Sequence, residues 1–179
     1  MKNFFRLAVT AVFIVACVLF GVNENVCSAE YTTSDGYTPN GRFYSAGVMD
    51  AFFKSDKGLL ISMYKINLIL NDDPRDFYLY MMEICQETNQ SPFNIKSITI
   101  MSETDSVEIP ANDSYRQTGL DFVTDRISYR DTGKVNRVIK SVWSKMLIRI
   151  TTTGGVVYDI YPSEEYIADA KKVADWASH

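Results

Sequence analysis

Apolar and polar residues alternate along residues 59–70, and this period of two predicts a β-strand. A polar turn at 71–76 separates this stretch from a second apolar run at 77–85. Because both faces of the second run are apolar, we expect a central strand that is covered on both sides. The two runs together predict an antiparallel hairpin.

Shorter runs with strand character follow along the chain. Residues 95–101 and 107–109 predict a second hairpin that turns through 102–105. Residues 122–129 predict one more strand. Residues 43–53 are expected to be ordered and packed, but helical spacing competes there with a glycine and several aromatic residues, so the element type stays open.

The clearest helical pattern lies at residues 135–146. Its apolar stripe consists of Val135, Val138, Ile139, Val142, Trp143 and Met146. Strands at 146–152 and 156–161 then flank a Gly-Gly turn, which predicts a hairpin. A final helix is expected to begin after Ser163, a good N-cap residue that two glutamates follow.

These elements predict an α+β fold, an antiparallel β-sheet or small sandwich of about six strands. An amphipathic helix near 134–145 and a C-terminal helix packed against it complete the prediction. The polar stretch 110–119 is expected to be irregular. Residues 30–42 are expected to be a flexible leader, and residues 43–179 a single globular domain.

The N-terminus has the order of a secretory signal. Lys2 and Arg6 bracket a basic start, residues 7–22 are almost wholly apolar, and Cys27-Ser28-Ala29 offers small residues for cleavage. We therefore predict that residues 1–29 are a signal peptide cleaved after Ala29. The working protein is then extracytoplasmic: periplasmic, envelope-associated or secreted.

Two alternatives remain for this segment. Ile14-Val15-Ala16-Cys17 has the form of a bacterial lipobox, which would make Cys17 the lipidated N-terminus, although the apolar Val18-Leu19-Phe20 would then remain in the mature chain. The segment could also stay uncleaved as an anchor, although its apolar run is shorter than the roughly 20 residues that span a bilayer. Only in these two cases would the protein contact a membrane through its N-terminus.

Composition narrows the class of protein. The chain has 179 residues, of which 46% are hydrophobic and 13% aromatic, values typical of an ordered globular protein. Of its 18 basic and 22 acidic residues, the signal would remove two and one, which leaves 16 against 21 and a net charge of −5. An acidic domain is a poor binder of polyanions, so nucleic acid is not expected as a partner.

The sequence has few of the histidine and cysteine residues that common catalytic and metal sites require. The single histidine is the terminal His179, and Cys85 is the one cysteine beyond the signal, so triads and zinc sites are not expected. Cys85 is interpreted as a buried thiol, with an intermolecular disulfide as the alternative. No nucleotide-binding motif occurs in the sequence, and no cofactor is expected.

Catalysis by two carboxylates remains possible, but the sequence does not point to any particular pair of acidic residues. Asp72, Asp73 and Asp76 cluster in the first predicted turn, but they lack the spacing of a calcium loop, so solvated turn residues are the favoured interpretation. Glu103 and Asp105, in the second predicted turn, are interpreted in the same way.

A basic stripe on the predicted helix is the best candidate contact surface. Its members are Lys134, Arg137, Lys140 and Lys145, with Ser141 among them and Arg130 just before the helix. Such a stripe could bind a lipid headgroup, an anionic wall polymer or an acidic protein, although an ordinary solvated helix face is the more frequent explanation. The eleven tyrosines could bind sugars or peptides on an exposed sheet face, but they are also common at the edge of a β-rich core.

The sequence therefore predicts an exported protein with a non-enzymatic binding or interaction role. Its expected partner is an unidentified protein or an anionic envelope component. The alternatives are a carboxylate-dependent hydrolase that acts on an envelope polymer and a structural subunit of a surface assembly.

Overall fold

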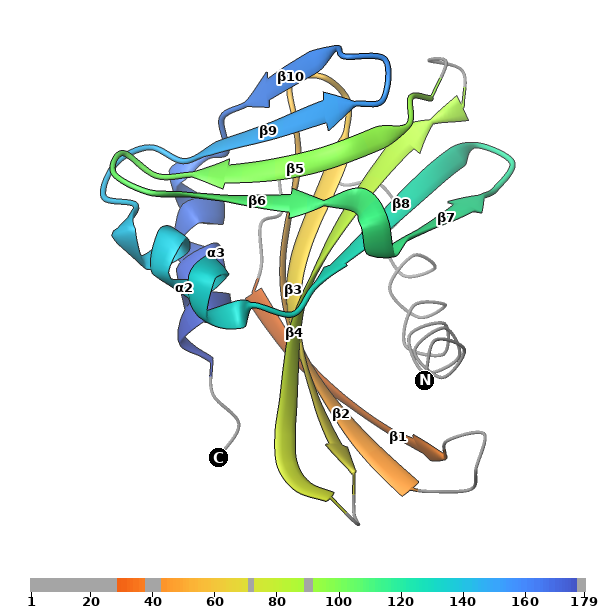
Figure 1. Cartoon of the computed structure of the whole chain (residues 1–179), viewed down its shortest axis with the longest axis vertical. Helices are drawn as coiled ribbons and strands as arrows, with labels where there is room; N and C mark the ends of the chain where they lie inside the picture. The colour runs from red at the N-terminus through yellow and green to blue at the C-terminus, as the bar shows by residue number, and fades with distance from the viewer. Residues whose placement is uncertain (1–28, 38–42, 71–72, 89–91, 177–179) are drawn as a thin grey trace.

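The chain folds into two antiparallel sheets and two helices (Figure 1). The structure, a computed structural model, describes residues 29–37, 43–70, 73–88 and 92–176. The larger sheet contains β1 (Ala29–Tyr37), β2 (Phe43–Lys54), β3 (Leu60–Leu70), β4 (Asp73–Glu87), β7 (Ser114–Thr118) and β8 (Phe122–Tyr129). The smaller sheet contains β5 (Ile95–Met101), β6 (Ser106–Pro110), β9 (Leu147–Thr152) and β10 (Val157–Ile160). The helices are α2 (Thr132–Ser141) and α3 (Glu164–Asp175), and a 3-10 turn η2 (Ala111–Asp113) follows β6.

The predicted α+β class is confirmed, whereas the predicted number of strands is wrong. The strand order is β1-β2-β3-β4-β8-β7 in one sheet and β10-β9-β5-β6 in the other, which makes ten strands within the described ranges. The additional strands β1, β2 and β7 are held by pairing with a neighbouring strand rather than by their own sequence pattern. The fully exposed β7, for example, lies in the stretch predicted to be irregular and pairs with β8 along its whole length.

The N-terminal part also differs from the prediction. Residues 29–37 form β1, an edge strand paired with β2, so a flexible leader is not what the structure shows for 30–37. Residues 38–42 lie outside the described residues, as do residues 1–28 with the predicted signal peptide and Cys17. The undecided stretch 43–53 is a strand because β2 is paired on both sides, with β1 and with β3.

One continuous core lies between the two sheets and the helices. β4 contributes Tyr80, Met82 and Ile84 to this core, all at most 1% exposed. They pack with side chains of the smaller sheet and of both helices, among them Ile98, Ile100, Val138, Ile139, Tyr166 and Val173. The two helices also contact each other, as predicted for the C-terminal helix.

The helix ends follow their capping residues. Ser163 accepts a hydrogen bond from the backbone N–H of Tyr166, so the predicted N-cap of α3 is confirmed. Asp131 caps α2 in the same way by accepting from Lys134 N–H. The predicted extent of α2 to residue 145 is wrong, because the helix ends at Ser141 and Val142 already has an extended backbone.

The long strands β2, β3 and β4 project well beyond the smaller sheet and the helices (Figure 1). β3 and β4 form the predicted hairpin, although Asp73 and Asp76 belong to β4 rather than to the turn. Within the described part of the chain, no helix has the length and apolar character needed to cross a membrane.

Candidate functional site

A single carboxylate holds the loop between α2 and β9. Glu103, in the turn between β5 and β6, accepts backbone N–H hydrogen bonds from Trp143 (3.2 Å), Ser144 (2.8 Å) and Lys145 (2.6 Å). The Ser144 hydroxyl donates a further bond of 3.0 Å to the same carboxylate. We call these bonds the Glu103 clamp. They fix three consecutive residues of an exposed loop, which a single side chain rarely does.

Trp143 is presented to solvent by this clamp. The sequence placed Trp143 in the apolar stripe of the helix, but its side chain is 76% exposed. The helix ends before Trp143 because the N–H groups of residues 143–145 donate to Glu103 instead of continuing the helical hydrogen bonds. An exposed tryptophan on a fixed backbone is a preorganised anchor for a partner, since little further ordering is needed on binding.

Two of the four cations in the predicted basic stripe form ion pairs with acidic residues. Arg137 Nε donates to Asp105 Oδ2 at 2.7 Å, and Lys140 Nζ lies 2.6 Å from Asp175 Oδ1. Lys134 and Lys145 have no ion pair with the described residues. The surface of α2 therefore carries mixed charge, and the free cation next to Trp143 in the chain is Lys145.

Ser141, predicted on the same stripe, has a structural contact instead. It is half-buried, and its hydroxyl lies 2.7 Å from the Ser102 hydroxyl and donates to Val138 O at 2.8 Å. This contact adds to the Glu103 clamp in joining α2 to the turn between β5 and β6.

The pKa of Glu103 reflects the clamp. Desolvation acts to raise it, but the backbone hydrogen bonds from Lys145, Ser144 and Trp143 outweigh this and lower the pKa from 4.5 to about 2. Asp105 next to it also has a lowered pKa, chiefly because of its hydrogen bond from Arg137. Both carboxylates are therefore ionised at neutral pH.

We expect the Trp143 loop to open in acid. Because the folded pKa of Glu103 is depressed, the clamp contributes fully above about pH 4.5 and is lost as the pH falls toward 2. Hydrogen exchange of the amides of residues 143–145, measured from pH 6 to pH 2, should accelerate relative to its intrinsic rate across this range.

Glu103→Gln keeps one acceptor oxygen but loses the titrating carboxylate, so its exchange should no longer depend on pH in this way. Asp105→Asn separates the titration of the nearby acid. An unchanged pH profile in Glu103→Gln would show that the carboxylate does not control the loop.

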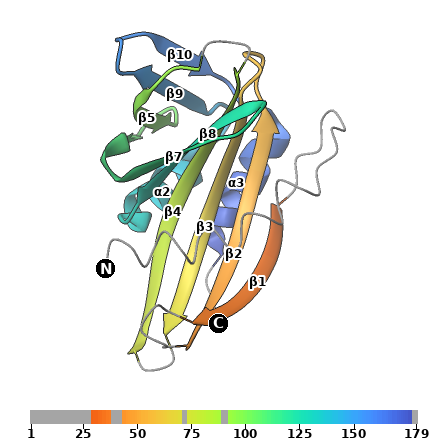
Figure 2. The ribbon, with the colours of Figure 1, turned by 90° about the vertical axis from the view of Figure 1, so that its right-hand side faces the viewer.

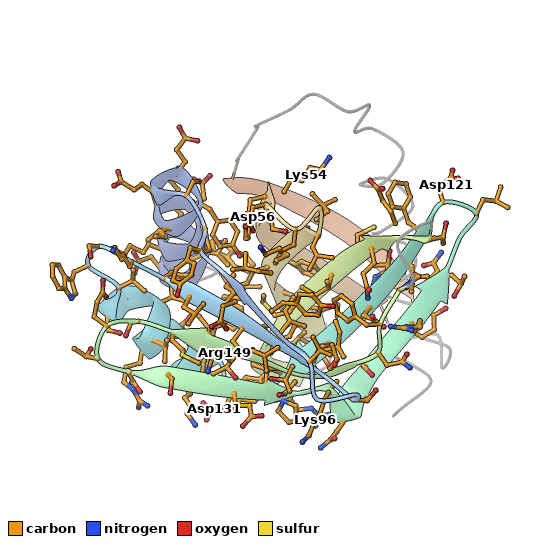
Figure 3. All side chains as sticks on the ribbon, turned by 90° about the horizontal axis from the view of Figure 1, so that it is seen from above. Lys54, Asp56, Lys96, Asp121, Asp131 and Arg149 are labelled. Carbon is orange, nitrogen blue, oxygen red and sulfur yellow. The ribbon has the colours of Figure 1, made fainter. Side chains whose placement is uncertain are left out.

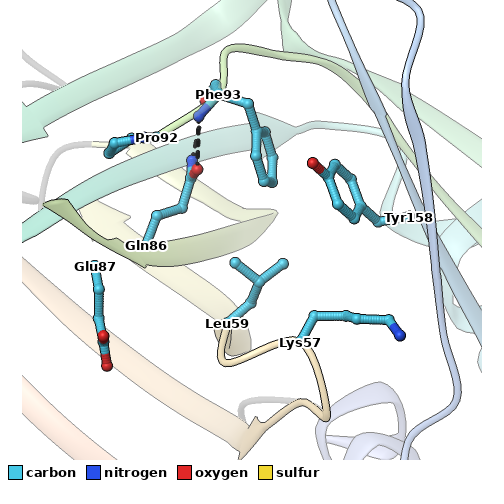
Figure 4. A pocket seen from close by; sticks show the side chains of 7 residues that line it. All are labelled: Lys57, Leu59, Gln86, Glu87, Pro92, Phe93 and Tyr158. Carbon is cyan, nitrogen blue, oxygen red and sulfur yellow. Dashed lines mark hydrogen bonds between the residues drawn. The ribbon is translucent and has the colours of Figure 1, made fainter. Parts of the chain in front are cut away.

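A small pocket lies beside the end of β4 and β10 (Figure 4). Its volume is about 100 Å³, and it is lined by Lys57, Leu59, Gln86, Glu87, Pro92, Phe93 and Tyr158. The Gln86 amide both donates to Phe93 O and accepts from Phe93 N–H, and the Phe93 ring stacks on Tyr158 with centroids 4.6 Å apart. The pocket is smaller than the several hundred Å³ typical of ligand sites, and one acid lines it.

Asp125 is the buried centre of a polar network beside this pocket. It is 5% exposed and accepts from Arg116 Nε (2.7 Å), Arg116 Nη2 (2.6 Å) and Gln86 Nε2 (3.1 Å). Arg116 also donates to Phe93 O and to the Asn94 side chain, just before β5. Asp125 therefore ties β4, β7 and β8 of the large sheet together, and Arg116 extends the network to the residues just before β5.

The buried acids Glu83 and Asp125 do not face each other. Glu83 is buried, which raises its pKa, but it pairs with Arg126 at 3.1 Å and lies on the opposite face of the sheet from Asp125. Asp56, Asp121 and Asp131 lie at separate places on the surface (Figure 3). Glu83 and Asp125 therefore do not form the pair of acids across a sugar-sized cleft that glycoside hydrolysis requires.

The remaining candidates from the sequence are not brought together. No cluster of His, Cys, Asp or Glu suited to a metal ion occurs among the described residues, and Asp72 and His179 lie outside them. Cys85 is a half-buried thiol that forms no disulfide with the described residues, and its sulfur accepts a hydrogen bond of 3.5 Å from the Thr124 hydroxyl. Tyr80 is fully buried and donates to Asn136, whereas Tyr161 is 67% exposed.

Sequence reasoning missed the Glu103 clamp, since Glu103 looked like an ordinary turn residue. Its partners lie about 40 residues further along the chain, so no local signal marks the contact. Comparisons of this chain with protein-family models, with curated proteins and with solved structures found no match.

Proposed function

We propose that this protein is an exported, non-enzymatic binding module of the periplasm, the cell envelope or the extracellular space. It holds an anionic envelope component through the loop that carries Trp143 and Lys145. The observation that supports this most directly is the exposed Trp143 on a backbone that the Glu103 clamp fixes.

The chemistry of the loop fits an anionic ligand with apolar or sugar-like parts. Trp143 offers a flat apolar surface, and the exposed Lys145 adds a cation whose backbone is fixed by the same carboxylate. Aromatic residues are enriched among the residues that dominate binding energies, and a cation nearby adds electrostatic attraction. Since Arg137 and Lys140 already have acidic partners, we expect them to contribute less than Lys145.

Trp143→Ala is expected to weaken binding to a soluble anionic wall polymer, polyglycerol phosphate, by about tenfold or more. Lys145→Ala should weaken it severalfold and make it less dependent on salt. Binding is measured by titration calorimetry on the protein as exported, so that all variants share one N-terminus. A parallel titration with phosphatidylglycerol vesicles tells a lipid headgroup from a wall polymer.

Two matched controls lie away from the loop. Tyr115→Ala removes a half-exposed aromatic residue from β7, and Lys96→Ala removes an exposed cation from β5, so both should bind like the unmodified protein. The proposal is wrong if Trp143→Ala binds as tightly as Tyr115→Ala, or if neither polymer nor vesicles bind at all.

A further inference from the structure

The smaller sheet ends in β10, an edge strand whose outer side has no partner strand among the described residues. β9 pairs with one side of β10, and the strand order places β10 at the end of the sheet. It lies at the upper rim of the molecule in both Figure 1 and Figure 2. Edge strands are usually protected by a lysine, a proline or a covering element, because their main-chain groups can pair with another strand. β10 has the sequence Val-Tyr-Asp-Ile and contains neither of these residues.

The hairpin geometry determines which main-chain groups face this open edge. Thr152 N–H donates to Val156 O at 2.9 Å, so the main chain of Val156 points toward β9. Main-chain direction alternates along an antiparallel strand, so the N–H and C=O groups of Val157 and Asp159 point away from β9. Within the described residues, no hydrogen bond takes up these outward main-chain groups. They are ready to pair with another extended chain.

The side chains along the edge are apolar around one acid. Val156, Val157 and Tyr161 are 54%, 49% and 67% exposed. Between them, the Asp159 carboxylate accepts from Arg149 Nε at 2.6 Å and Arg149 Nη2 at 2.7 Å, and its side chain is still 35% exposed. Because side chains alternate along a strand, Val157 and Asp159 lie on the same, outer face of the sheet. The edge therefore presents an acid with apolar side chains on both sides of it.

A second copy of this chain fits the edge poorly. If two β10 strands pair so that Val157 lies opposite Tyr161 of the other copy, the two Asp159 side chains lie directly opposite each other. Like charges in this position are destabilising. A register moved by two residues separates the acids, but it places Val157 opposite Asp159 and loses the apolar pairs. Two identical edges therefore do not complement each other, whereas a strand that carries a cation does.

The charges around β10 also favour a cationic partner. Glu164 and Glu165 are exposed and form the first turn of α3, a few residues after β10 ends. The nearby cation Lys57, which lines the pocket together with Tyr158, already lies 3.2 Å from Asp56. Acidic groups are therefore in excess at this end of the smaller sheet.

We propose that the open edge of β10 binds an extended segment of a partner protein, which carries a lysine or arginine opposite Asp159 and apolar residues two positions to either side. The segment adds a fifth, antiparallel strand to the smaller sheet. Its main chain pairs with Val157 and Asp159, and its two apolar side chains contact Val157 and Tyr161. A lipid or a polysaccharide lacks the regular N–H and C=O groups that this edge would pair with. The proposal goes beyond the binding role of Trp143 and does not depend on it.

The test is an NMR titration of the isotope-labelled protein, as exported, with the peptide acetyl-Thr-Val-Thr-Lys-Thr-Val-Thr-amide. The amide signals of Val157 and Asp159 should shift, and their hydrogen exchange should slow by about tenfold or more at saturation. A peptide with glutamate in place of the lysine should bind about fivefold more weakly, because two acids then lie opposite each other. A third peptide, N-methylated on the main chain at the lysine and at the valine that follows it, should not bind, since it lacks the two N–H groups that face β10.

Three variants distinguish pairing at this edge from general stickiness. Val157→Pro removes an outward N–H without breaking a bond to β9, so it should weaken binding while far-UV circular dichroism is unchanged. Asp159→Asn keeps the main chain and should abolish the preference for the lysine peptide over the glutamate peptide. Tyr115→Ala changes an exposed aromatic residue on β7, another edge strand, and should bind like the unmodified protein.

Three results would overturn the proposal. The first is that the Val157 and Asp159 amides do not respond to the lysine peptide. The second is that the N-methylated peptide binds as tightly as the unmodified one. The third is that these two amides are already protected without peptide in a species of doubled native mass that dissociates on dilution, because a second copy would then occupy the edge.

Discussion

Asp125→Ala is expected to lower the free energy of unfolding by about 3 kcal/mol, because it removes the acceptor at the centre of a buried network. Arg116 would lose its bidentate partner, and Gln86, which is 3% exposed, would lose one of its acceptors. The measurement is urea denaturation at pH 7, followed by far-UV circular dichroism.

Two variants test whether the charge at this position matters. Asp125→Asn keeps the shape and one acceptor oxygen, so its loss should lie between zero and that of Asp125→Ala. Asp159→Ala breaks the partly exposed pair with Arg149 and should cost much less than Asp125→Ala. If Asp125→Ala and Asp159→Ala prove equally mild, the buried network does not hold β4, β7 and β8 together.

Ile139→Ala is expected to lower the free energy of unfolding by about 2 to 5 kcal/mol. Ile139 is fully buried on the inner side of α2 and belongs to the core cluster with residues of both sheets. Truncation leaves a cavity that the surrounding strands can fill only in part. The loss should appear in urea denaturation as a lower midpoint with an unchanged slope.

A graded series and an exposed neighbour serve as controls. Ile139→Val should cost about 0.5 to 1.5 kcal/mol, since it removes one methyl group. Trp143→Ala, four residues further on and exposed, should change stability by no more than about 0.5 kcal/mol although it removes a larger side chain. A large loss of stability in Trp143→Ala would mean that the Trp143 side chain packs against the fold and is not available to a partner.

The sequence predicted best those elements whose pattern agrees with their final environment. The alternation at 59–70 and the two apolar faces of 77–85 became β3 and β4, and the apolar stripe from residue 135 became α2. The N-cap at Ser163 was local as well, because the donor lies three residues further on. Such elements depend on side chains that are near each other in the chain.

The sequence failed where an element or a contact depends on a partner that its own local pattern does not show. β7 is polar and fully exposed, and it is a strand because β8 offers it a free edge. Trp143 has helical spacing, but Glu103 binds the backbone after α2 and ends the helix. The basic stripe looked free until folding brought Asp105 to Arg137 and Asp175 to Lys140.

The sequence by itself determined the α+β class, the central hairpin and both helices, because period and capping are local properties. Tertiary structure alone decided that there are two sheets, that Trp143 is exposed on a fixed loop, and that Asp125 joins β4, β7 and β8. The reason is that a hydrogen bond or an ion pair depends on the distance between two residues in space. The local sequence pattern around one residue does not show a partner 40 positions away.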